Sequence, residues 1–331
     1  MSGGEAHGPW YVRVMLGIAG LIAAIFLLGF FGLALRGIFD SKGAAIIVGA
    51  MIVAGAYVML RFASGDFGAM FSLALSLAGQ VLLAVGIFGV FDTRHDAAAA
   101  WTAMALVELG LAFAMPNYIH RLAAALAVGV MLQLALTPVG GRALTAGVLA
   151  AALVLAWFAA YRLQQAREVF IPIGYGAALA LVVAESARSW TRWIFWSERA
   201  PAGWITPQAG QGIVLLVFVA AIVAYLQLVG WRTSERRSVV ALATAVLVAA
   251  ASFKAPGIAS GLLMVLAGFA AGRRVMIGLG IAALLFYLSS YYYLLDATLL
   301  YKAGVLAATG VELLAARWVV LNLVLAEEAR A

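Results

Sequence analysis

Long apolar segments follow one another along almost the whole chain, and they constrain its fold more than any other feature. At least eleven are long enough to cross a bilayer. An α-helix rises about 1.5 Å per residue, so about 20 residues span the hydrocarbon core. Hydrophobic residues make up 66% of the 331 residues and charged residues 11%, whereas about a quarter of the residues of a soluble domain are charged. The sequence therefore predicts an all-α, polytopic transmembrane helix bundle.

About twelve spans (eleven to twelve) account for the chain, so we expect a single transmembrane domain over residues 1–331. Three of these spans (122–136, 239–251 and 257–272) are short for a crossing, and Pro116, Pro138 and Pro256 stand beside them. Because proline ends or kinks helices, one of these segments is a candidate re-entrant piece. The predicted spans are 14–35, 44–60, 69–91, 97–115, 122–136, 143–161, 169–184, 212–231, 239–251, 257–272, 275–295 and 297–319.

The distribution of basic residues predicts the orientation. With twelve spans and a cytoplasmic start, twelve lysines and arginines lie in cytoplasmic segments and eight in outer segments. Basic residues favour the cytoplasmic side of a membrane. We therefore expect a multi-pass protein of the bacterial inner membrane with both termini in the cytoplasm. Residues 1–10 lack a basic cluster and a cleavage site, so the first apolar segment is expected to be a retained span.

One long connection, 186–211, is rich in tryptophan and arginine. Tryptophan prefers the headgroup level of a bilayer, and arginine beside it can reach phosphates. This composition predicts an interfacial helix on the outer surface, and a lid over a cavity is the alternative. The residues that carry this prediction are Arg188, Trp190, Arg192, Trp193 and Trp196.

Several polar side chains lie inside predicted spans. Gln80 and Glu108 lie near the middle of the third and fourth spans, and Glu185 closes the seventh. Charges within a membrane are costly, so they face protein or water and have partners. These three residues are therefore candidates for an intramembrane polar site.

The last span adds a polar stripe of Thr298, Lys302, Thr309 and Glu312, which fall within about 80° of arc on a helix. The stripe is predicted to face the bundle interior. Lys302 and Glu312 are too far apart to pair, so Lys302 is expected to pair with Glu185 or, failing that, with Glu108. Three roles are open for these groups: polar contacts that hold the bundle together, a path for a solute or ion, and contact with another subunit.

The sequence gives no sign of a cofactor or metal site. Cysteine is absent, and His7, His95 and His120 are far apart at predicted membrane edges, so no metal-ligand spacing appears. Phosphate loops, nucleophile elbows and metalloprotease helices are also missing. The net charge of +7 comes from basic residues beside apolar spans, which bind lipid headgroups rather than nucleic acid.

Two short runs carry a resemblance to a known family. They are residues 291–302 (YYYLLDATLLYK) with Thr309-Gly310 after them, and residues 76–80 (SLAGQ). Together they resemble an uncharacterised bacterial multipass family, a domain of unknown function whose members are often encoded beside a membrane protein with a GDYXXLXY motif. The resemblance implies an inner-membrane protein with a second membrane protein as partner. It also places Gln80, Asp296 and Lys302 within the shared pattern.

The leading functional prediction is a transporter-like or channel-like path for a small solute or ion, with proton coupling through Glu108, Lys302 and Glu312. The alternative is a membrane scaffold that assembles with a partner membrane protein or with copies of itself. A membrane enzyme comes third, because no catalytic motif is present. A wet cavity that reaches Glu108 or Lys302 would favour transport, and a dry core with an apolar outer groove would favour the scaffold.

Overall fold

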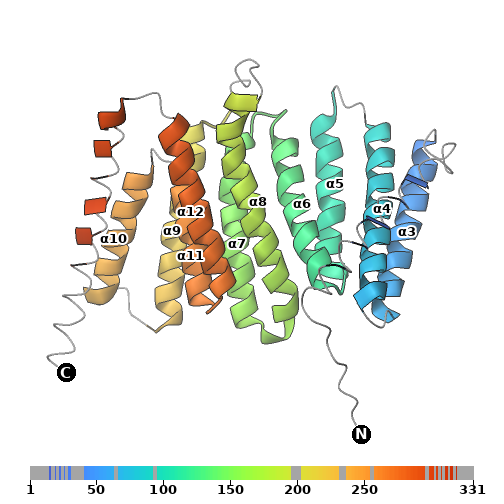
Figure 1. The fold of residues 1–331 in the computed structure, drawn as a ribbon, viewed down its shortest axis with the longest axis horizontal. Coiled ribbons are helices and arrows are strands. Elements are labelled where there is room, and N and C mark those ends of the chain that lie inside the picture. The colour runs from blue at the N-terminus through green and yellow to red at the C-terminus, as the bar shows by residue number, and fades with distance from the viewer. Residues whose placement is uncertain are drawn as a thin grey trace, which may run out of the picture. The chain divides into compact units, whose positions relative to one another are not determined.

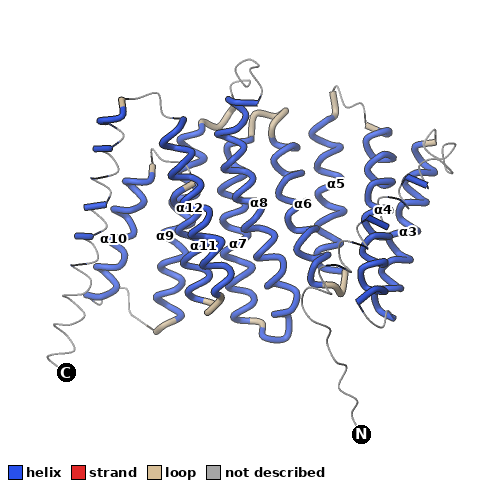
Figure 2. Tube along the Cα trace, in the orientation of Figure 1, coloured by secondary structure: helices blue, strands red, loops and turns tan. Residues whose placement is uncertain are grey.

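The computed structural model describes residues 41–62, 66–91, 95–194, 203–230, 236–253 and 257–294, with single positions between 15 and 30 and between 298 and 318. Every regular element in the continuous ranges is helical (Figure 2), which confirms the all-α prediction for this part of the chain. The α-helices are α3 (Lys42–Phe62), α4 (Asp66–Val90), α5 (Ala97–Ala114), α6 (Tyr118–Leu136), α7 (Thr145–Arg162), α8 (Arg167–Ile194), α9 (Pro207–Leu228), α10 (Arg236–Ser252), α11 (Ile258–Ala270) and α12 (Arg274–Leu294). Two 3₁₀ turns, η1 (Arg142–Leu144) and η2 (Gln164–Ala166), precede α7 and α8.

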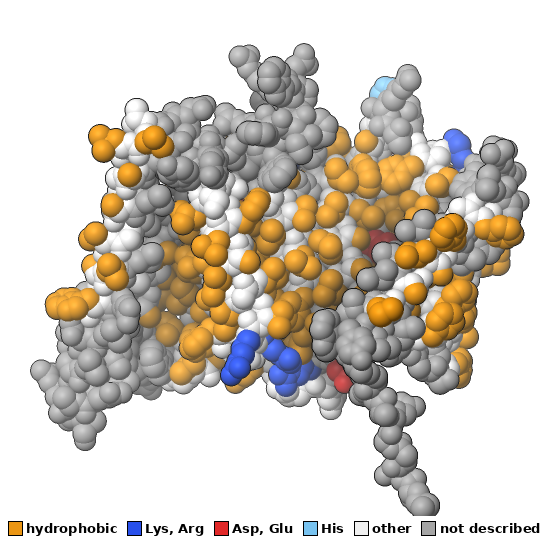
Figure 3. Space-filling model, viewed as in Figure 1, with side chains coloured by type: hydrophobic (Ala, Val, Ile, Leu, Met, Phe, Trp, Pro, Cys, Tyr) orange, Lys and Arg blue, Asp and Glu red, His pale blue; other side chains and the backbone are white. Residues whose placement is uncertain are grey.

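Each of these ten helices coincides with one predicted span. Seven of them, α3 to α9, are long and apolar enough to cross a membrane, and shorter apolar stretches form α10, α11 and α12. Hydrophobic side chains cover much of the helical face in Figure 3. The protein is therefore embedded in a membrane. The total of about twelve spans stays a prediction, because spans 14–35 and 297–319 lie outside the continuously described residues.

Two predicted segments differ from the structure. The predicted short span 122–136 is a helix of 19 residues that begins at Tyr118, because the Asn117 side chain caps it by accepting hydrogen bonds from the backbone of Ile119 and His120. This length suffices for a crossing. Residues 186–194 continue α8 instead of forming a separate interfacial helix, since this stretch contains no glycine or proline to end the helix.

The helices form two compact units, an N-terminal unit (Met1–Pro138) and a C-terminal unit (Val139–Ala331). Within each unit successive helices run in opposite directions (Figure 1). The strongest contacts join consecutive helices: α3 with α4, α5 with α6, α7 with α8, and α11 with α12. In the N-terminal unit, Val53 of α3, Leu83 of α4 and Met115 after α5 form a hydrophobic cluster.

Glycines bring α3 and α4 into backbone contact. A Cβ atom added to Gly49 would lie 2.8 Å from the backbone nitrogen of Leu83, and one added to Gly79 would lie 2.9 Å from the carbonyl oxygen of Gly49. Small residues allow this approach in membrane helices, where van der Waals packing has to hold the helices together. The pair therefore depends on the absence of a side chain at these positions.

In the C-terminal unit, α11 is the central helix. It contacts α7, α8, α9, α10 and α12, and its Leu263 and Met264 are fully buried. With 13 residues, α11 is only about 20 Å long, shorter than the hydrocarbon core of about 30 Å. It begins after Gly257, whose φ of +93° is a conformation that favours glycine. The ring of Tyr287 covers the Cα of this glycine.

We predict that Gly49→Ala separates α3 from α4 and lowers the free energy of unfolding by about 1–3 kcal/mol, the usual cost of overpacking. Gly55→Ala on the same helix is the matched control, because a Cβ there meets nothing within 4 Å. The control is expected to be neutral or slightly stabilising, since alanine favours helix more than glycine by up to about 1 kcal/mol. Thermal unfolding in detergent measures both, and equal midpoints for the two variants would contradict the prediction.

Candidate functional site

A buried polar cluster joins α4 and α6 in the N-terminal unit. The Ser76 hydroxyl lies 2.8 Å from Nε2 of His120, and the amide nitrogen of Gln80 lies 3.1 Å from the same Nε2. The Gln80 amide also donates a hydrogen bond of 3.2 Å to the Ser76 hydroxyl. All three side chains are buried. Gln80, one of the predicted site residues, is thus a buried polar group, and its partners are side chains that the sequence analysis did not select.

His120 is the residue that sequence reasoning missed. It was predicted at a membrane edge, yet it is only 2% exposed. The discrepancy arises because the α5–α6 turn lies beside the middle of α4, so that the first turn of α6 meets Ser76 and Gln80. The spacing of four residues between Ser76 and Gln80 was visible in the sequence and places both on one face of a helix. The position of the turn was not visible.

Glu108 lies on the buried stripe of α5 and is 2% exposed. Its Oε2 has no hydrogen-bond partner among the described residues. A buried carboxylate oxygen without a partner is costly, and through this oxygen Glu108 makes no contact that holds the described helices together.

Glu185 has a different environment in the C-terminal unit. It is 2% exposed on α8, and its Oε1 accepts a hydrogen bond of 2.9 Å from the Ser260 hydroxyl on α11. This contact ties the central short helix to α8. The predicted partner of Glu185, Lys302, lies outside the described residues, so that pairing stays a prediction.

The structure describes the side chain of only one of the other predicted site residues, Thr298. Thr298 is exposed, and its hydroxyl accepts a hydrogen bond of 3.4 Å from the backbone of Tyr301. The end of α8 carries Arg188, Trp190, Arg192 and Trp193, whose side chains are not described. The remaining predicted residues lie outside the described part of the chain: Asp296, Lys302, Thr309, Glu312 and Trp196. Among the described residues, no group of three or more histidine, cysteine, aspartate or glutamate side chains could hold a metal ion.

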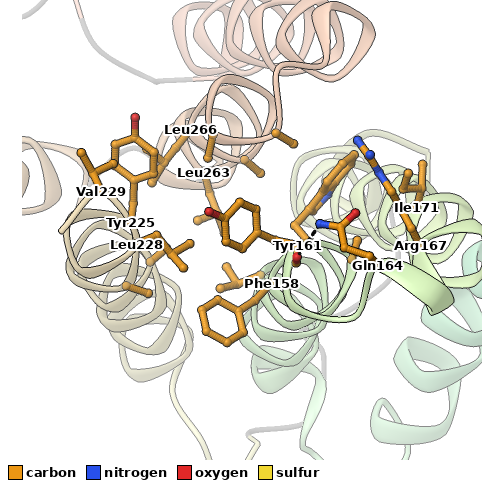
Figure 4. A pocket seen from close by; sticks show the side chains of 18 residues that line it. Phe158, Tyr161, Gln164, Arg167, Ile171, Tyr225, Leu228, Val229, Leu263 and Leu266 are labelled. Atoms are coloured by element: carbon orange, nitrogen blue, oxygen red, sulfur yellow. Dashed lines mark hydrogen bonds between the residues drawn. The ribbon is translucent and has the colours of Figure 1, made fainter.

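A cavity of about 450 Å³ lies within the C-terminal unit, between α7, α8, α9 and α11. This volume is typical of sites for small ligands. Figure 4 shows Phe158 and Tyr161 of α7 across the space from Tyr225 and Leu228 of α9. The cavity was not predicted, because its walls come from four helices whose packing the sequence does not specify. Glu108 belongs to the other unit and does not line it.

The cavity opens where the helices end. Tyr161 and Val229, which line it at the ends of α7 and α9, are about half exposed, at 52% and 47%. Gln164 and Arg167 line it at the α7–α8 turn, and the Gln164 amide donates a hydrogen bond of 2.9 Å to the Tyr161 carbonyl (Figure 4). The mouth is therefore polar and the interior apolar.

Among the described side chains, four arginines mark this end of the C-terminal unit, which we call the basic end. They lie in the α7–α8 and α11–α12 turns, beside the ends of helices that line the cavity. Basic side chains gather at one edge of the face shown in Figure 3. Among described side chains, Glu168 is the acidic residue of these turns. The arginines of the basic end are Arg162, Arg167, Arg273 and Arg274.

We predict opposite effects of removing the two buried glutamates. Glu108→Leu removes a carboxylate oxygen that has no partner in the described part of the chain, and this substitution should raise the free energy of unfolding by about 1 kcal/mol or more. Glu185→Leu leaves the buried Ser260 hydroxyl without its acceptor and should lower the free energy of unfolding by about 1–3 kcal/mol. Thermal unfolding of the purified protein in detergent tests both. A destabilised Glu108→Leu variant would show that Glu108 has a structural partner.

A family model described as "Domain of unknown function (DUF4401)" matches residues 9–323. The chain therefore belongs to this family, in agreement with the resemblance to an uncharacterised family. Searches of curated proteins and of solved structures found no match to the chain.

Proposed function

We propose that this DUF4401 family member binds a small solute within the membrane and moves it across, with the cavity of the C-terminal unit as part of the path. One observation carries the proposal. A half-open cavity of about 450 Å³ lies between helices of the C-terminal unit and opens at the helix ends. A space of this size with an apolar lining and a few polar groups is typical of sites for small ligands.

The short central helix supports this assignment. Transporters commonly bind their substrates beside helices that do not cross the whole bilayer. The α11 helix has 13 residues, and five residues between its middle and its C-cap line the cavity. Proton coupling through Glu108, Lys302 and Glu312 stays a prediction, since the cavity does not reach Glu108.

The alternative function is a scaffold for a second membrane protein or for further copies of this chain. Two polar clusters favour it, Ser76–Gln80–His120 and Ser260–Glu185. Their side chains form hydrogen bonds with one another within the protein, as expected of groups that hold helices together. The resemblance, with its neighbouring membrane protein, supports the same alternative.

Because the chain contains no cysteine, a single introduced cysteine can test directly whether the path is filled with water. We predict that the thiol of Ala224→Cys, which lines the cavity on α9, reacts with a membrane-impermeant maleimide. Ala220→Cys is the control, because Ala220 is exposed one turn earlier on α9 and does not line the cavity. A thiol in lipid stays protonated and unreactive.

Transport further predicts that the cavity of the same variant is accessible from both sides of the membrane. The Ala224→Cys thiol should react from both sides of the membrane, in intact cells and in inverted vesicles, because a carrier exposes its site alternately. Reaction from one side alone would indicate a closed-ended binding site. No reaction from either side would favour the scaffold.

We also propose an inner-membrane location with the basic end of the C-terminal unit and both termini in the cytoplasm. Gln165→Cys, exposed in the α7–α8 turn, is then expected to be protected from the impermeant maleimide in intact cells. Gln208→Cys, exposed at the start of α9, is expected to react. A reporter that works only in the cytoplasm should be active when attached to Ala331. The reverse labelling pattern would invert the topology.

A further inference from the structure

The cavity has two parts of different chemistry. Its interior is lined by aliphatic and aromatic side chains of α7, α9 and α11, such as Phe158, Ala221 and Leu263. Its mouth has the guanidinium of Arg167, and the guanidinium of Arg162 lies 5.1 Å from the ring centre of Phe158, which itself lines the cavity. A ligand that satisfies both parts has an apolar body and an anionic end.

A third feature lies deeper in the cavity. Trp157 lines it, is only 8% exposed, and its indole N–H has no hydrogen-bond acceptor among the described residues. Indole nitrogen is a donor only, and leaving it unpaired costs free energy. A Cβ atom at Gly174 would lie 2.9 Å from this nitrogen, so the indole packs directly against the backbone of α8 at this glycine. The nitrogen is covered there, so Trp157 gives the cavity apolar ring surface and no hydrogen-bond donor.

The volume limits the apolar body of the ligand. The whole cavity, 450 Å³, holds about 15 groups of methylene size, at roughly 30 Å³ each, the volume of a water molecule in the liquid. A single acyl chain fills this space when its charged end lies at the mouth beside Arg167.

We propose that the cavity binds an anionic single-chain phospholipid, with its phosphate at Arg167 and its acyl chain among the apolar residues of α7, α9 and α11. This assignment rests on the proposed function, since it names the substrate class of the same cavity. Charge complementarity supports it, because the basic end of the C-terminal unit carries four arginines beside Glu168. Hydrogen bonds between arginine and phosphate are among the strongest in proteins.

The test uses the full-length protein in nanodiscs of zwitterionic lipid, with the thiol of Ala224→Cys as reporter. The probes are myristoyl lysophosphatidic acid, its phosphocholine counterpart, and glycerol 3-phosphate as the head group alone. Lysophosphatidic acid is expected to slow alkylation of the thiol at concentrations at least tenfold lower than the phosphocholine lipid. Glycerol 3-phosphate is expected to give no protection. Ala271→Cys on the opposite wall is a second reporter in case the first variant does not fold.

Two substitutions test the phosphate contact. Arg167→Gln should raise the half-protecting concentration of lysophosphatidic acid at least tenfold. Arg61→Gln is the matched control, because Arg61 is also an exposed arginine at a helix end, 5.2 Å from the ring centre of Tyr57, but belongs to the N-terminal unit. The control should leave the concentration unchanged.

The remaining outcomes separate the two proposals. Equal protection by both lipids, unaffected by Arg167→Gln, would mean that only the acyl chain is bound and would overturn the anionic specificity. Protection by glycerol 3-phosphate alone would identify a soluble phosphate ester as the ligand and would also overturn it. A reactive thiol that no probe protects would overturn this inference but leave the proposed solute path intact. A thiol that never reacts would overturn both.

Discussion

The absence of water from the bilayer core is the constraint on which the rest of this structure depends. Backbone polar groups in hydrocarbon must find partners within the protein, and α-helices satisfy them locally. This accounts for a chain whose described elements are all helical and joined by short turns. The same constraint applies to side chains: Ser76, Gln80 and His120 bond to one another, and Glu185 accepts from Ser260. Glu108 departs from this rule, because its Oε2 has no partner among the residues that the structure describes, which is why it is the residue to test for a role beyond packing.

In lipid the hydrophobic effect does not drive helices to associate, so close packing has to hold them together. Gly49 and Gly79 bring α3 and α4 to backbone contact, and glycines between α11 and α12 have the same effect in the C-terminal unit. Where large side chains replace small ones, the helices separate. Trp157, Phe158 and Tyr225 stand between α7, α9 and α11, and the cavity lies among them. The alternation of small and large residues thus determines where the bundle is tight and where it leaves space.

The cavity also connects the polar and apolar parts of the C-terminal unit. Arg167 and Gln164 lie at its mouth because the α7–α8 turn reaches the membrane surface, and the helices behind the turn are apolar because they cross the membrane. A site of this construction resembles the bilayer itself, with charge at the edge and hydrocarbon inside. That similarity is the physical reason for proposing an amphiphile, and Arg167 at the mouth is the reason for proposing an anionic one.

The sequence by itself determined the class of the protein and the position of its described helices, since apolar length and charged junctions are local properties of a chain in a membrane. It also identified Gln80, Glu108 and Glu185 as buried polar groups, because polar side chains inside apolar spans must face protein. It did not identify their partners. His120 meets Ser76 only because the α5–α6 turn lies beside the middle of α4, and the cavity exists only because α11 is short and aromatic residues from other helices surround its end. These are contacts between residues far apart along the chain, and only the tertiary packing decided them.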